Sequence, residues 1–226
     1  MRAFFSKAAL RAAATLTAGW CVAFASASNI ATWTFETTIP ATAGPHAAEL
    51  GSGSATGFHS DASSVYSNPS GNGSVESFSS NFWSVGDYYQ FQVSTTGYNS
   101  ITIDWDQTSS NTGPRDFQLS YSTDGATFTN VGSVYAVLAN AAPNPVWSAG
   151  TPQPIFHFGP ISLPAGANNQ AAVYVRLSDA STISANGGTV ATSGTDRVDN
   201  VAINGVPEPA TLTLLAIGAL GLIRRR

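Results

Sequence analysis

Three histidines and a set of carboxylates are the residues of this chain whose types allow acid–base or metal chemistry. The histidines are His46, His59 and His157, separated by 13 and 98 positions. A local metal pair needs histidines on one strand face or one helix turn, and neither separation fits. His157 lies between two phenylalanines, where an extended strand would turn it outward. We therefore expect no histidine to act in catalysis or metal binding.

Asp104 and Asp106 flank Trp105, and a strand would place both on one face, roughly 7 Å apart. Such a pair can supply half of a calcium site or the two carboxylates of a glycosidase. The alternative is a solvated strand face in an acidic protein. A glycoside hydrolase or lyase would need one of Asp104, Asp106 or Asp116 for turnover. We expect that the chain is not an enzyme and has no catalytic residues.

A second acidic pair lies on the expected first and last strands. The first strand ends at Glu36, and the last runs through Asp199, Val201 and Ile203. If Val201 and Ile203 face the core, strict alternation places Asp199 inward as well. A carboxylate there must be paired, hydrogen-bonded or bound to a metal.

The Phe-Glu that closes the first strand and the Asp-Asn-Val of the last are similar to residues of jelly-roll carbohydrate-binding modules. In those modules, such residues bind a structural calcium where the first and last strands meet. The resemblance implies that Glu36 and Asp199 hold Ca²⁺, completed by backbone carbonyls. The alternative is a salt bridge or hydrogen-bond network, for example between Asp199 and Arg197 or Arg176. We expect no other cofactor.

Sugar binding requires exposed aromatic faces for stacking and polar groups for hydroxyls. Candidates near loops or at outward positions are Trp83, Tyr66, Tyr88, Trp147 and Tyr174. Core packing explains most aromatic residues in a small sandwich, and spacing singles out no subset of these.

In the segments that must position these residues, the apolar side chains recur at every second position. Apolar and polar residues alternate over 88–93, 101–106, 117–122 and 173–178, which is typical of strands with one buried face. Further strands are expected over 30–36, 75–82, 127–137, 153–161 and 198–203, and Asp124-Gly125 predicts a hairpin turn. Residues 37–74 are rich in Gly, Ser, Thr and Pro and predict a long loop region. Residues 28–205 are thus predicted to form an all-β domain, an antiparallel two-sheet β-sandwich of jelly-roll type.

Charge is scarce and unevenly placed. Of 226 residues only 10% are charged, and from position 28 to 206 there are 12 acidic residues against three arginines, Arg115, Arg176 and Arg197. The resulting charge of 3 − 12 = −9 repels phosphate backbones, so we expect no nucleic-acid partner.

The first 27 residues follow the order of a secretory signal peptide. A basic segment reaches Arg11, an apolar run extends to Phe24, and Ala25-Ser26-Ala27 supplies the small residues that signal peptidase requires. We place cleavage after Ala27, with Ala25 and Ala27 at the recognition positions. The one cysteine, Cys21, then leaves with the leader, so the exported protein has no disulfide or cysteine nucleophile.

The last segment, 206–226, begins with Pro207, Glu208 and Pro209, continues as an apolar run over 211–223, and ends in Arg224, Arg225 and Arg226. The apolar run has no polar face, unlike a surface helix. At about 1.5 Å per residue its helix would be roughly 20 Å long, short of the ~30 Å hydrocarbon core, so it would span only with local thinning and arginine snorkelling. Three terminal arginines favour a cytoplasmic end.

This order resembles the PEP-CTERM sorting signal of exopolysaccharide-producing Gram-negative bacteria, in which a Pro-Glu-Pro motif, an apolar helix and a basic end are recognised by the membrane transpeptidase exosortase. Pro207, Glu208 and Pro209 match the motif, and Arg224 to Arg226 match the basic stop. The apolar run is a few residues shorter than is usual in the family. The flanking prolines disfavour helix, so the scissile region is expected to be extended.

Together, the two ends predict an exported protein that passes through the inner membrane and is then cut by exosortase and passed to the cell surface or the extracellular, biofilm-type matrix. The expected partners are signal peptidase, exosortase, the membrane before processing, and extracellular polysaccharide. The sandwich would serve a structural, adhesive or polysaccharide-associated role. The alternative is a calcium-stabilised carbohydrate-binding module.

Overall fold

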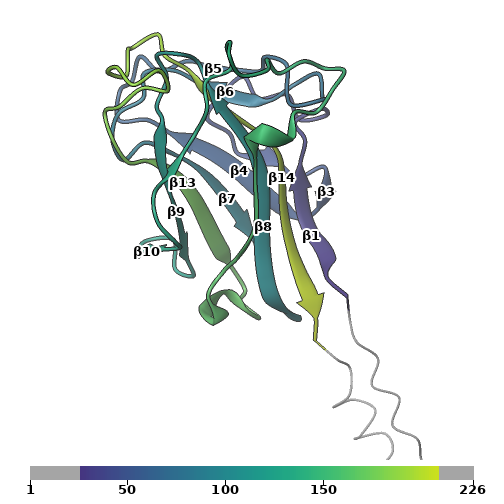
Figure 1. Cartoon of the computed structure of the whole chain (residues 1–226). Helices are drawn as coiled ribbons and strands as arrows, with labels where there is room; N and C mark the ends of the chain where they lie inside the picture. The colour runs from purple at the N-terminus through teal and green to yellow at the C-terminus, as the bar shows by residue number, and fades with distance from the viewer. Residues whose placement is uncertain (1–25, 209–226) are drawn as a thin grey trace, which may run out of the picture.

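The computed structural model describes residues 26–208, and these form two packed antiparallel sheets, called sheet A and sheet B (Figure 1). Sheet A contains β1 (Ser28–Trp33), β3 (Leu50–Gly51), β5 (Tyr66–Ser67), β6 (Phe78–Ser80), β8 (Tyr98–Ser109), β12 (His157–Ser162) and β14 (Asp196–Pro207). Sheet B contains β2 (His46–Ala47), β4 (Gly53–Phe58), β7 (Tyr88–Val93), β9 (Asp116–Ser122), β10 (Thr129–Asn130), β11 (Tyr135–Ala136) and β13 (Val173–Asp179). The predicted all-β sandwich is confirmed.

The strand order places sequence-distant segments side by side. Sheet A runs β12-β8-β14-β1-β3, and β6 pairs with both β14 and β5. Sheet B runs β10-β9-β13-β7-β4-β2, with β11 on β9. The only helical turns in residues 26–208 are two 3₁₀ turns, η1 (Pro154–Phe156) and η2 (Ala165–Ala167). No helix in this part of the chain is long and apolar enough to cross a membrane.

The core lies between the sheets and is largely aromatic. In β7, Tyr89, Phe91 and Val93 are buried while the alternate residues are half-buried, as the period-two pattern predicts. Trp33 of β1 meets Phe91 of β7 with ring centroids 5.2 Å apart. This tilted contact joins the two sheets, in a geometry that favours aromatic pairs.

The prediction of a long loop region over 37–74 is only partly correct, because this region also contains strands. It contains β4, which pairs with β7 over six residues, from Gly53 opposite Val93 to Phe58 opposite Tyr88. Glycine and serine weaken the strand signal, yet a Cβ on Gly53 would lie 2.7 Å from the Trp33 ring. Close packing, which no local pattern reveals, therefore requires glycine here.

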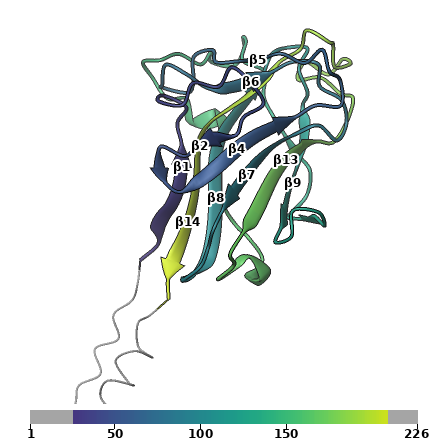
Figure 2. The same ribbon diagram turned by 180° about the vertical axis from the view of Figure 1, so that it is seen from behind.

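The first and last residues of the sandwich domain lie at the same pole of the molecule. β1 and β14 are antiparallel neighbours, and Ser28 lies opposite Gly205. Figures 1 and 2 show β1 entering and β14 leaving at the same pole, with the longer loops gathered at the opposite one. The first and last residues of the domain are thus held together by the sheet itself.

Candidate functional site

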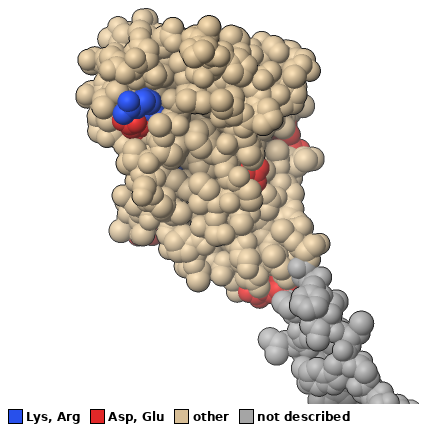
Figure 3. Space-filling model, in the orientation of Figure 1, with Lys and Arg blue, Asp and Glu red and all other residues tan. Residues whose placement is uncertain are grey.

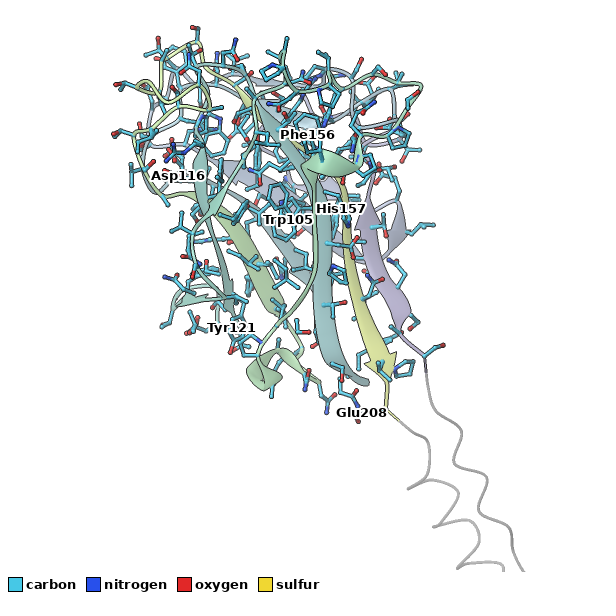
Figure 4. The ribbon with its side chains drawn as sticks, viewed as in Figure 1. Trp105, Asp116, Tyr121, Phe156, His157 and Glu208 are labelled. Atoms are coloured by element: carbon cyan, nitrogen blue, oxygen red, sulfur yellow. The ribbon has the colours of Figure 1, made fainter. Side chains whose placement is uncertain are left out.

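The sorting motif begins inside the last strand. β14 extends to Pro207, with Val206 opposite Asn99 and Pro207 opposite Tyr98 of β8. The backbone N–H of Glu208 donates to a carbonyl of the residue preceding β8 at 2.8 Å, and Figure 4 shows Glu208 just beyond the arrowhead of β14. The extended backbone expected at the motif is confirmed for Pro207.

The remaining residues of the two terminal predictions lie outside the described part of the chain. These are the leader to Ala25, Pro209, the apolar run, and Arg224, Arg225 and Arg226. The signal peptide, its cleavage after Ala27 and the terminal helix therefore stay predictions.

Asp106 is not on a solvated strand face, contrary to expectation. Its side chain is buried, because Asn72 of the loop between β5 and β6 and Asn200 of β14 cover it. Oδ2 accepts hydrogen bonds from the amides of Asn72 and Asn200, each at 2.9 Å, and Oδ1 lies 2.9 Å from His157 Nδ1. Asp104 does stay half-buried on the outside, where it accepts a 3.1 Å bond from Asn204.

Asp116, the third carboxylate of the hydrolase hypothesis, lies in the other sheet from Asp104 and Asp106. Asp116 begins β9 in sheet B and is held by Arg115 at 2.8 Å and by the Ser181 hydroxyl at 2.6 Å. These contacts lower the pKa of Asp116, the arginine hydrogen bond being the main cause. Figure 4 shows Asp116 well apart from Trp105 and His157, so the structure does not assemble the three carboxylates of that hypothesis.

Asp199 is buried, as strand alternation predicts. Its Oδ2 accepts the backbone N–H of Asn72 at 2.8 Å and the Ser74 hydroxyl at 2.5 Å, and its Oδ1 accepts the N–H of Asn200 at 2.7 Å. Burial raises the pKa of Asp199 to about 7. The predicted hydrogen-bond alternative thus describes this carboxylate, with two loop residues and the neighbouring strand residue, rather than arginines, as donors.

Glu36 lies just after β1, which ends at Trp33 rather than at Glu36 as predicted. It reaches the same loop, since its Oε1 accepts the N–H of Glu76 at 2.8 Å. The two carboxylates predicted to bind calcium therefore contact neighbouring residues of one segment, 72–76. Donors occupy both oxygens of Asp199 and Oε1 of Glu36, and Ca²⁺ would have to displace them to bind through these atoms. Within residues 26–208, no three His, Cys, Asp or Glu side chains form a metal-binding group. Calcium binding stays a prediction.

The structure forms a Ser–His–Asp arrangement that spacing did not reveal. His59 Nε2 lies 2.8 Å from Ser80 Oγ, and His59 Nδ1 lies 3.0 Å from Asp87 Oδ2. The order of contacts is that of a hydrolase triad. However, the His59 and Asp87 side chains are each only 1% exposed, and the Trp83 ring packs against His59 at 4.6 Å. No substrate carbonyl can approach Ser80, so this cluster stabilises the fold.

Four stacked side chains stand on the outward face of sheet B, and we call them the arginine stack: Phe58, Tyr88, Arg176 and Phe128. The guanidinium carbon of Arg176 lies 3.8 Å from the Tyr88 ring centroid and 3.7 Å from that of Phe128. Phe58 and Tyr88 are stacked at 5.1 Å, and Phe58 is 48% exposed. Arg176 Nε donates to Gln90 Oε1 at 2.8 Å.

The charge around the arginine stack differs from that of the whole domain. The outward residues of β4, β7 and β13 as far as Ser178 include no Asp or Glu. Among residues 26–208, no carboxylate forms an ion pair with Arg176. The opposite side of the molecule, in Figure 3, shows one blue patch directly beside a red one, in keeping with the Arg115–Asp116 pair. In the described part of the chain, the Arg176 guanidinium is therefore held by aromatic rings and an amide rather than by a carboxylate.

The aromatic candidates for sugar stacking divide into three groups. Trp83 and Trp147 are buried, so they belong to the core. Tyr66 is half-buried and stacks on Phe78 at 5.6 Å. Tyr88 and Tyr174 are half-buried on the outward face of sheet B. This is the face that carries the arginine stack.

Several solved structures are similar in fold at low sequence identity. The K1 cleaved adhesin domain of Lys-gingipain from Porphyromonas gingivalis is 16% identical, with 79% of this chain and 97% of that chain covered and a TM-score of 0.44. The CBM22-1–GH10 modules of a Clostridium thermocellum xylanase complexed with xylohexaose are 13% identical, with 80% and 29% covered and a TM-score of 0.45. The N-terminal cellulose-binding domain of a Cellulomonas fimi β-1,4-glucanase is 13% identical, with 75% and 100% covered and a TM-score of 0.35.

Comparison with curated proteins gives no match. Comparison with protein families gives one match, which falls on the end of β14 and the residues after it. Residues 205–226 of this chain carry the PEP-CTERM protein-sorting motif, as the resemblance of Pro207, Glu208 and Pro209 predicted.

Proposed function

We propose that this protein is exported, cut at its C-terminal motif by an exosortase-type enzyme, and delivered to the cell surface or extracellular matrix with the sandwich as its cargo. The observation that carries the proposal is the sorting motif at residues 205–226, which follows a complete sandwich without a linker. The leader-like first 27 residues supply the export step. The low lysine content and acidic, hydroxyl-rich body suit a hydrated matrix.

The delivery step is tested by changing the motif in the full-length protein in its native host. The variant Glu208→Ala/Pro209→Ala should accumulate uncut in the membrane fraction, while the parent protein reaches the surface or medium. Pro152→Ala, at an exposed loop residue outside the motif, is the matched control and should be delivered normally. Normal delivery of the motif variant would contradict the sorting proposal.

We further propose that the arginine stack gives the sandwich its polysaccharide-associated role. Aromatic rings pack against the apolar faces of sugars, and Phe58 offers a half-exposed ring. The Arg176 guanidinium and the Gln90 amide, already joined by one hydrogen bond, have further N–H groups for hydroxyls or a carboxylate. Rings on both sides hold the guanidinium in place, so binding costs little side-chain entropy.

This role is tested with residues 28–205 on neutral and acidic polysaccharides by affinity electrophoresis. Phe58→Ala and Arg176→Ala should each weaken retardation about tenfold, as loss of one stacking or charge-assisted contact predicts. Leu50→Ala, which removes an even more exposed apolar side chain from sheet A, should bind like the parent. Equal binding by all four proteins would rule out the arginine stack as the site.

A further inference from the structure

The sorting motif and the sandwich share residues, so they compete for the same backbone groups. The last pairs of β14 with β8 join Val206 to Asn99 and Pro207 to Tyr98. The N–H of Glu208 is then donated at 2.8 Å to the carbonyl just before β8. The first two motif residues are therefore part of the folded sheet, not of a free tail.

β1 covers the other side of β14 only as far as Gly205, which lies opposite Ser28. From Val206 onward the strand is paired with β8 alone. Pro207 has no N–H and adds no donor to the ladder. This end of β14 is thus the least supported part of a central strand, and strand ends of this kind open locally at low cost.

A cleaving enzyme that reads a peptide as an extended strand needs the backbone N–H and C=O groups around the scissile bond. While residues 206–208 are paired with β8, one edge of this segment is unavailable. The body of the sandwich also lies directly beside it, because no spacer separates Gly205 from the motif.

We infer that the end of β14 is a gate for processing: the enzyme acts on molecules in which residues 206–208 have separated from β8. This inference rests on the proposed function. The rate of cutting then follows the open fraction of this short segment. The surface around Gly97 and Tyr98 is the part of the sandwich that must approach the membrane enzyme.

The gate is tested by locking it with a disulfide. In Asn99→Cys/Val206→Cys the two residues are directly opposite in an antiparallel pair, a separation that a disulfide can bridge. The only native cysteine, Cys21, is in the leader. We expect the full-length variant, in its native host, to be cut at least about tenfold more slowly than the parent, and the rate to recover when reductant is added.

The matched control locks the same two strands farther from the motif. Asn204 lies opposite Thr102, so Thr102→Cys/Asn204→Cys carries the same cross-link but leaves residues 206–208 free to open. We expect this variant to be cut at the parental rate. Equal slowing in both variants would mean that a cross-link in β8 and β14 hinders processing generally, and would overturn the gate.

A spacer tests the gate in the opposite direction. Insertion of Gly-Ser-Gly-Ser between Gly205 and Val206 moves the motif away from β8 and should speed cutting several-fold. Cutting of the disulfide-locked variant at the parental rate, or no gain from the spacer, would contradict the inference while leaving exosortase sorting intact. Failure of the parent protein to be cut at all would instead contradict the proposed function.

Discussion

At the residue scale, the domain is distinguished by carboxylates enclosed in a protein with few cations. Burial raises the pKa of both Asp179 and Asp199 to about 7, and it raises the pKa of Asp196 well above its usual range. Asp179 Oδ2 has no hydrogen-bond partner among the described residues. These groups retain protons in the folded state that the unfolded chain releases.

The stability of the sandwich should therefore fall as the pH rises. A carboxyl group with a raised pKa contributes stability below its unfolded pKa of 3.8, and that contribution is lost as the pH rises through about 7. Burial lowers the pKa of His59, which opposes this trend below the unfolded histidine value. From pH 5.5 to 8.5 Asp179 and Asp199 together lose about 4 kcal/mol. His59 offsets part of this, so we expect a net loss of about 3 kcal/mol, or roughly 9 °C in Tm.

Thermal unfolding of residues 28–205 at the two pH values measures this loss. Asp179→Asn, which cannot ionise, should reduce the difference in Tm by roughly half. A Tm that rises with pH, or a pH dependence unchanged in the variant, would show that these carboxylates are ionised in the folded protein.

The predicted calcium site also depends on Asp199. Both Asp199 oxygens accept hydrogen bonds, so an ion would enter only by displacing them. If the predicted site exists, calorimetry should show one Ca²⁺ per domain, and Asp199→Asn should weaken its binding at least tenfold by removing a charged ligand. Absence of heat for the parent protein would end the calcium prediction.

At the element scale, the sequence predicted a strand correctly wherever apolar and polar residues alternate along it. The pattern of β7 and β13 follows from their own side chains, so both were predictable. Asp106 lies on the outward face in the alternation of β8, but Asn72 of the loop between β5 and β6 and Asn200 of β14 cover it. No pattern within β8 contains that information. The His59–Ser80–Asp87 cluster was missed for the same reason, because packing alone joins three segments.

In strand β4, which the sequence did not predict, Gly53 lies where there is no room for a side chain. A Cβ on Gly53 would lie 2.7 Å from both the Gln92 carbonyl oxygen and the Trp33 ring, so Gly53→Ala should destabilise the domain by about 1–3 kcal/mol through overpacking. Gly150→Ala is the control, since its Cβ would meet no atom within 4 Å, and should change stability by less than about 0.5 kcal/mol. Urea unfolding of both variants measures the difference, and equal midpoints would mean that β4 is not packed as described.

At the scale of the whole molecule, one pole carries both ends and the other carries the long loops (Figures 1 and 2). Ser28 and Gly205 lie opposite each other on neighbouring strands, about 5 Å apart. In the proposed precursor, the points at which the leader and the sorting tail join the sandwich are therefore adjacent. The longer loops lie at the opposite pole. The sequence predicted the two terminal segments, but only the strand pairing shows that Ser28 and Gly205, where they join the sandwich, are neighbours.

The central claim is that the sandwich is a cargo released at its last strand. Intact-mass measurement of the protein from its native host, with and without the host's exosortase, tests it most directly. We predict a product that begins at Ser28 and ends within or next to Pro207–Pro209 when the enzyme is present, and a chain that extends to Arg226 when it is absent. A mature protein that retains Arg224 to Arg226 in the presence of the enzyme would contradict the account.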